Sequence, residues 1–186
     1  MADTMRSGGG WNSRPWRIAA WSVAAGLMLL PVMASLATGG TDWSNGDFVF
    51  VAVVLFGSCF LFDLAARKAP NFPYLAGAGC ALAAGFGLIV VNGAVGLVGS
   101  EDEAHNLWFG AAILVAITGA LIARGRSEGM ARAMFAAAIT HIAVSAALLI
   151  GAGGVAEGGL SMEIVGLAGF AAMWLTSAAL FHYSAR

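Results

Sequence analysis

Charged residues are scarce in this sequence: they make up 10% of its 186 residues, whereas hydrophobic residues make up 60%. Soluble domains carry about 25% charged residues, so the composition excludes an ordinary soluble protein and predicts a membrane protein. The formal net charge of -1 gives no reason to expect binding to nucleic acid. The two cysteines, Cys59 and Cys80, both lie inside apolar runs, which excludes a disulfide framework and a CxxC metal site.

Motifs of enzymes are scarce as well. The chain has no HExxH sequence, no phosphate-binding glycine loop and no recognisable pair of nucleophile and base. Membrane spans account for nearly all of its length, which leaves no room for a soluble catalytic domain. We therefore predict no catalytic residue and no cofactor, and a role other than catalysis is the main expectation.

Long apolar runs are what the sequence has in abundance. A helix that crosses the hydrocarbon core of a membrane needs about 20 mostly apolar residues. Six runs meet this requirement, and the short connections between them favour antiparallel hairpins. The predicted fold is an all-α, integral membrane bundle of six transmembrane helices over residues 17–186, preceded by a disordered cytoplasmic tail at 1–16. The six spans are expected at roughly 17–38, 47–66, 74–99, 106–124, 129–150 and 161–183.

Basic residues give the bundle an orientation. All nine Lys and Arg residues fall on one side of the six-span arrangement, and most of the acidic residues fall on the other. Because Lys and Arg concentrate in cytoplasmic loops, both termini are predicted to be cytoplasmic. The first span also has features of a cleavable signal peptide, although its apolar stretch is long for one. Cleavage would leave the orientation of the later spans unchanged.

The turns on the side without Lys or Arg carry several carboxylates. Capping is the main explanation, because Ser44 with Asp47 and Ser100 with Glu103 fit the arrangement in which a serine caps a helix and a carboxylate reaches back to it. The alternative is a cation-binding rim. Carboxylate oxygens suit hard divalent cations, and an imidazole would also admit zinc or copper. The candidate metal ligands are Asp42, Asp47, Glu101, Asp102, Glu103 and His105.

Two polar side chains are expected inside the bundle. Asn92 lies in the outer part of the third run, and His141 lies near the middle of the fifth. Polar groups at such depths need partners and are candidates for function. The main interpretation is that both hold helices together through hydrogen bonds, and the alternative is that they line a pathway for protons or a small solute. A haem on His141 would need a second axial histidine at that depth, where neither His105 nor His182 lies.

Closely spaced glycines predict tight packing between helices. Gly93, Gly96 and Gly99 recur at three-residue spacing in the third run, as do Gly166 and Gly169 in the sixth. Small residues at such spacing let the backbones of two helices come close together in lipid. We therefore expect these two runs to make close helix contacts.

Three segments resemble parts of small multi-span inner-membrane proteins of bacteria. They are DWSNGDFVF at 42–50, VNGAVGLVGSED at 91–102 and ARGRSEGMARAMFAAA at 123–138. The resemblance covers most of the chain from about residue 17 onward. It implies a multi-pass protein of the bacterial inner membrane and brings no established activity with it.

Three classes of function remain open. The leading one is a non-catalytic accessory or interaction component of a membrane assembly, whose partners are the lipid bilayer and other membrane subunits or a second copy of the chain. The second is a transporter or channel for a small cation or solute that uses His141 and Asn92. The third is a membrane redox or metal-binding protein, for which His141 and His105 are the available ligands.

Overall fold

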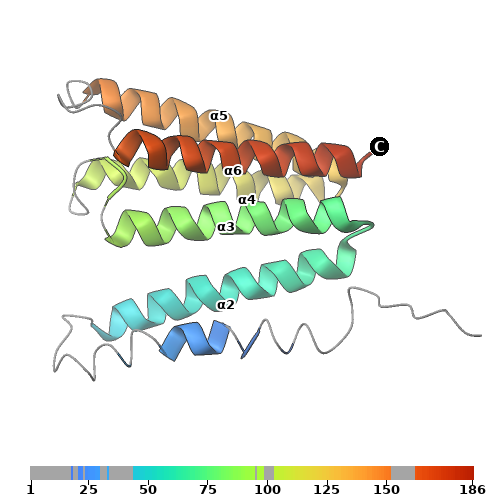
Figure 1. The fold of residues 1–186 in the computed structure, drawn as a ribbon, viewed down its shortest axis with the longest axis horizontal. Helices are drawn as coiled ribbons and strands as arrows, with labels where there is room; N and C mark the ends of the chain where they lie inside the picture. The colour runs from blue at the N-terminus through green and yellow to red at the C-terminus, as the bar shows by residue number, and fades with distance from the viewer. Residues whose placement is uncertain are drawn as a thin grey trace, which may run out of the picture. The chain divides into compact units, whose positions relative to one another are not determined.

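The chain is helical over most of the residues that its computed structural model describes, which are 44–94, 96–98, 103–151 and 162–186, with scattered residues between 18 and 33. No strand occurs among these residues. The predicted tail at 1–16 and most of the first predicted span lie outside them. The helices are α2 (Asn45–Lys68), α3 (Phe72–Ala94), the 3-10 helix η1 (Ala104–Phe109), α4 (Gly110–Ala123), α5 (Ser127–Gly151) and α6 (Met162–Ser184) (Figure 1).

Five stretches of the described residues are long and apolar enough to cross a membrane, as in a multi-pass membrane protein: α2, α3, η1 together with α4, α5, and α6. They coincide with the second to sixth predicted spans, and this part of the prediction is confirmed. The third span is shorter than expected, because α3 ends at Ala94 and not at position 99. Gly96 follows with a φ of 72°, a left-handed conformation that glycine adopts without strain and that commonly ends a helix.

The chain divides into two compact units, Met1–Lys68 and Ala69–Arg186. In the second unit α6 packs against both α3 and α5, and α4 packs against α5. Each of these neighbouring pairs runs antiparallel (Figure 1), as short connections require. We refer to α3–α6 of the second unit as the four-helix bundle.

Glycine brings α4 and α5 into close contact. A Cβ atom added to Gly119 would lie 2.5 Å from the Cβ atom of Ala133, and one added to Gly129 would lie 2.7 Å from that of Ala123. Both distances are far below van der Waals contact, so only glycine fits at these two positions without a shift of the helices. The turn between the helices is equally tight, with positive φ values of 51° at Arg124 and 80° at Gly125.

The glycines that the sequence analysis identified by their three-residue spacing do not lie at such helix contacts where the structure describes them. A Cβ atom added to Gly93, Gly166 or Gly169 would meet none of the described residues within 4 Å, so within that part of the chain the prediction of close helix contacts at these positions is wrong. Gly96 lies beyond the end of α3, and Gly99 lies outside the described residues. In a membrane helix, glycine spacing alone does not say which face meets a neighbour.

The helix α2 of the first unit begins and ends with paired side chains. At its start, Oδ2 of Asp47 accepts hydrogen bonds from the backbone N–H of Ser44 at 2.7 Å and from its hydroxyl at 2.9 Å. The Ser44 hydroxyl in turn accepts from the Asp47 N–H at 3.3 Å, so the predicted capping arrangement at this helix is confirmed. Near its end, Arg67 donates through Nε and Nη2 to Oδ2 of Asp63, at 3.1 and 3.0 Å.

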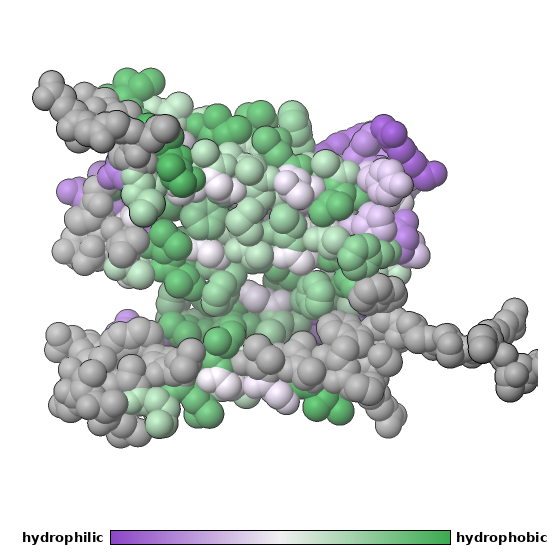
Figure 2. Space-filling view, viewed as in Figure 1, coloured by the Kyte–Doolittle hydropathy of each residue, from purple (hydrophilic) through white to green (hydrophobic). Residues whose placement is uncertain are grey.

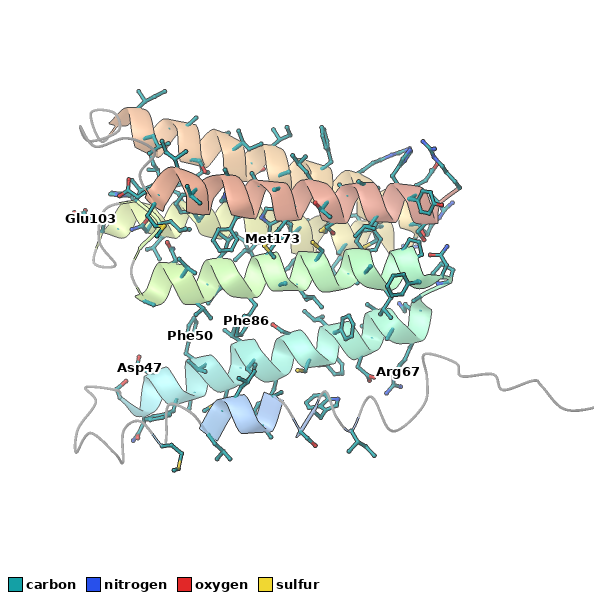
Figure 3. All side chains as sticks on the ribbon, viewed as in Figure 1. Asp47, Phe50, Arg67, Phe86, Glu103 and Met173 are labelled. Carbon is teal, nitrogen blue, oxygen red and sulfur yellow. The ribbon has the colours of Figure 1, made fainter. Side chains whose placement is uncertain are left out.

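Charged side chains gather at the ends of the helices. In the second unit the basic end is formed where α4 ends, α5 begins and α6 ends, and hydrophilic surface gathers there in Figure 2. Glu103 and Glu163 lie at the opposite end of this unit, near the starts of η1 and α6. In α2 the acidic Asp47 and the basic Arg67 lie at opposite ends of the helix (Figure 3). The charged side chains of these helices thus lie near helix ends, outside the apolar middles.

Candidate functional site

The corner between α3 and α4 is built around the buried side chain of Asn106. Its Oδ1 accepts from the backbone N–H groups of Leu97 and Val98, at 3.3 and 3.1 Å. Its Nδ2 donates to the Val98 carbonyl at 3.1 Å. The carboxamide therefore pairs with both backbone groups of Val98 and with the N–H of Leu97, beyond the end of α3. We call Asn92, Leu97, Val98, His105 and Asn106 the α3–α4 corner.

Asn92 joins this corner from the last turn of α3. Its Nδ2 donates to the backbone carbonyl of Asn106 at 2.8 Å, which confirms the predicted bond to a neighbouring helical segment. Because α3 ends at Ala94, Asn92 lies closer to the helix end than the sequence suggested. Its Oδ1 is buried and has no hydrogen-bond partner among the described residues.

His105 also contributes to the corner. Its Nε2 lies 3.0 Å from the Val98 carbonyl, and a carbonyl only accepts, so this nitrogen carries a proton. Its Nδ1 lies 3.7 Å from a carboxylate oxygen of Glu103. Glu103 is labelled in Figure 3, at this end of the four-helix bundle. With Nε2 bonded to Val98, His105 offers at most one nitrogen to a metal ion.

The predicted metal ligands are only partly brought together. Glu103 and His105 are neighbours, whereas Asp47 belongs to the other compact unit, and Asp42, Glu101 and Asp102 lie outside the described residues. Within the described part of the chain, no group of three or more His, Cys, Asp or Glu side chains could hold a metal ion. The expected capping of η1 by Ser100 also falls outside that part, and Glu103 itself caps η1 without a side-chain hydrogen bond.

His141 lies at the centre of the four-helix bundle and is 0% exposed. Its Nε2 lies 3.1 Å from the Leu167 carbonyl of α6, so it donates there and links α5 to α6. Its ring packs against Phe109 and Phe170, with centroid distances of 5.4 and 6.2 Å. The predicted hydrogen-bonded histidine within the bundle is therefore present, with one of its two nitrogens engaged by backbone.

Trp174 is a core residue that the sequence did not single out. It is 2% exposed, and its Nε1 is buried without a hydrogen-bond partner among the described residues. On the same helix, the Ser177 hydroxyl donates to the Gly77 carbonyl of α3 at 2.7 Å. Both residues lie in the middle of an apolar run, where composition alone does not separate a core position from one that faces lipid.

The basic end of the four-helix bundle is tied by four further polar side chains. Tyr74 donates its hydroxyl to the Gly125 carbonyl at 2.9 Å, and Asn71 donates through Nδ2 to the Ser184 carbonyl at 3.2 Å. The hydroxyls of Ser127 and Ser184 lie 3.2 Å apart. The start of α3 is thereby held to the α4–α5 turn and to the end of α6.

Comparisons of the chain with protein-family models, with curated proteins and with solved structures find no match. The geometry of the described residues is therefore what supports a function.

Proposed function

We propose that this chain is a non-catalytic accessory or interaction component of a membrane assembly, a six-span protein of the bacterial inner membrane with both termini in the cytoplasm. Five apolar helices of sufficient length and the gathering of the basic residues of the four-helix bundle at one of its ends support the membrane part of this proposal. The resemblance to small multi-span inner-membrane proteins supports the location.

One observation carries the proposed role. The three polar side chains with the strongest claim to chemistry each bond to a backbone carbonyl of another segment: Asn92 to Asn106, His105 to Val98 and His141 to Leu167. Such bonds fix the positions of helices and corners, which is the work of a scaffold. A scaffold acts through its surface, and in a bilayer that surface meets lipid and other membrane chains.

The outward faces of the helices supply such a surface. Large apolar side chains are exposed on α4 and α6, among them Leu121 at 72%, Ile122 at 77% and Met162 at 85%. Without a strong hydrophobic driving force in lipid, association of helices depends on packing and on polar contacts. The proposed partners are therefore other membrane subunits or a second copy of the chain, packed against these faces within the bilayer.

Recovery of the assembly tests this proposal. The tagged chain is cross-linked in intact cells, solubilised under mild conditions and purified, and the expected result is stoichiometric recovery of one or a few membrane subunits or of a dimer of the chain. An unrelated multi-pass protein with the same tag and expression level is the control for non-specific capture. Recovery of the chain alone as a monomer, in several detergents and after cross-linking, would contradict the proposal.

Transport of a small cation or solute is a second candidate, and one observation favours it. His141 and Asn92 each keep one buried polar atom, Nδ1 and Oδ1 respectively, that has no partner among the described residues. In this case His141→Ala abolishes flux through the reconstituted protein, whereas the control His182→Ala, at the exposed end of α6, leaves it intact. Equal flux in the two variants would remove His141 from any pathway.

A further inference from the structure

Two polar atoms in the core of the four-helix bundle have no hydrogen-bond partner among the described residues: Nδ1 of His141 and Nε1 of Trp174. Their side chains are almost completely buried, at 0% and 2% exposure. Buried polar groups in native proteins are nearly always paired with protein or with water. Both residues lie in the middle of their helices, α5 and α6.

The two atoms have opposite hydrogen-bonding roles. Nε2 of His141 donates to the Leu167 carbonyl, so Nδ1 of the neutral ring is an acceptor. The indole Nε1 of Trp174 is a donor only. One buried group therefore lacks a donor while the other lacks an acceptor.

Helix geometry places Trp174 on the face of α6 that His141 contacts. Trp174 follows Leu167 by two helical turns and therefore lies on the same face of α6, the face that receives the hydrogen bond from His141. Side chains on a helix lean toward its N-terminus, which directs the indole toward the turn that contains Phe170. Its Cη2 atom lies 3.9 Å from where a Cβ atom of Gly85 on α3 would be. The ring of Phe170 is itself a neighbour of the His141 ring, with centroids 6.2 Å apart.

We propose that a water molecule binds between these two rings, where it donates a hydrogen bond to Nδ1 of His141 and accepts one from Nε1 of Trp174. The rings are not hydrogen-bonded to each other. Water is the smallest molecule with both a donor and an acceptor, and a buried water needs two to four polar partners. The proposal goes beyond the accessory role, because it assigns a polar binding position inside the apolar bundle.

NMR spectroscopy of the full nitrogen-15-labelled chain in lipid nanodiscs tests this proposal. The expected result is magnetisation exchange between water and the indole N–H of Trp174, with an Nδ1 chemical shift for His141 typical of a hydrogen-bond acceptor. Trp174→Phe removes the donor that holds the water and is expected to shift the His141 Nδ1 resonance. The matched control Trp108→Phe, at a position that is 66% exposed, is expected to leave that resonance in place.

Three results would overturn the proposal. A scalar coupling between the two nitrogens would reveal a direct hydrogen bond between the rings. An indole N–H of Trp174 that exchanges no magnetisation with water would also refute it, as would an Nδ1 shift typical of an unbonded nitrogen. All three are read from the unaltered chain, so the test holds even where Trp174→Phe does not fold.

Discussion

Single residues hold this molecule together mainly by bonding to backbone. The carboxamide of Asn106 pairs with Val98, the imidazole of His141 reaches the Leu167 carbonyl, and the hydroxyl of Ser177 reaches the Gly77 carbonyl. In an apolar environment a backbone group without a partner is costly. Each of these side chains therefore fixes a segment in place by satisfying it.

Asn106→Ala should destabilise the four-helix bundle. The change removes three hydrogen bonds to Leu97 and Val98 and leaves buried backbone groups unpaired, so we expect the free energy of unfolding to fall by about 1–3 kcal/mol. Titration of the protein in mixed micelles with a denaturing detergent, followed by tryptophan fluorescence, measures this loss.

Asn45→Ala is the matched control, because Asn45 is an exposed asparagine at the start of α2. Its effect on the same titration is expected to stay within about 0.5 kcal/mol. Equal effects of the two substitutions would show that the corner does not depend on the Asn106 carboxamide.

At the scale of helices, the sequence predicted which segments are helical better than how they pack. Apolar length identified α2, α3, α5 and α6, because only a helix satisfies its own backbone in lipid. It did not reveal that α3 ends early or that the fourth span opens with a 3-10 turn. Helix faces were also hidden, because residues that face lipid and residues that face the core are both apolar. The close α4–α5 contact at Gly119 was missed for this reason.

Gly119→Ala and Gly169→Ala should change stability in opposite directions. The added methyl group at Gly119 would lie 2.5 Å from the Cβ atom and 3.1 Å from the Cα atom of Ala133, so the helices must separate, at a cost of about 1–3 kcal/mol. At Gly169 the methyl group meets no atom of the described residues within 4 Å. There we expect a gain of up to about 1 kcal/mol from the higher helix propensity of alanine.

The same detergent titration measures both variants. A loss at Gly169 as large as that at Gly119 would contradict the helix contacts described for α4 and α6.

Asp47→Ala should loosen the start of α2. The substitution removes the oxygen that receives both the N–H and the hydroxyl of Ser44, and loss of such a cap costs about 0.5–2 kcal/mol. Backbone chemical shifts of the full chain in micelles are expected to show reduced helicity in the first turn of α2 only. Unchanged shifts at Ser44 and Phe48 would show that the cap contributes nothing in solution.

At the scale of the whole molecule, the distribution of charge predicts how the chain is oriented in the membrane. The basic residues of the four-helix bundle lie at one end, and Glu103 and Glu163 lie at the other. The proposed orientation places the basic end in the cytoplasm, as the distribution of Lys and Arg in loops requires.

Cysteine labelling in intact cells measures this orientation. In a background in which Cys59 and Cys80 are replaced by alanine, Glu103→Cys should react with a membrane-impermeant maleimide. Tyr183→Cys should react only after the membrane is permeabilised. Both positions lie outside the middle of their helices, and Tyr183 is 65% exposed. The reverse pattern of labelling would invert the proposed topology.

The candidate site shows where reading the sequence reaches its limit. His141 and Asn92 were identified as interior polar residues because an apolar run makes such residues conspicuous, and both have the expected hydrogen bonds. The partner atoms could not be predicted, because a backbone carbonyl has no signature in the sequence. Asn106 and Trp174 were missed because their importance depends on which segment lies across from them.

The pairing of Asn106 with Val98 has a consequence for how this chain can evolve. The carboxamide recognises the main chain of its partner, so any apolar side chain that fills the same volume can replace Leu97 or Val98 without loss of the two-way pairing. Position 106 has no such freedom, because glutamine is one methylene too long and aspartate lacks the N–H group. If selection preserves this corner, related sequences should vary among apolar residues at positions 97 and 98 and keep asparagine at position 106.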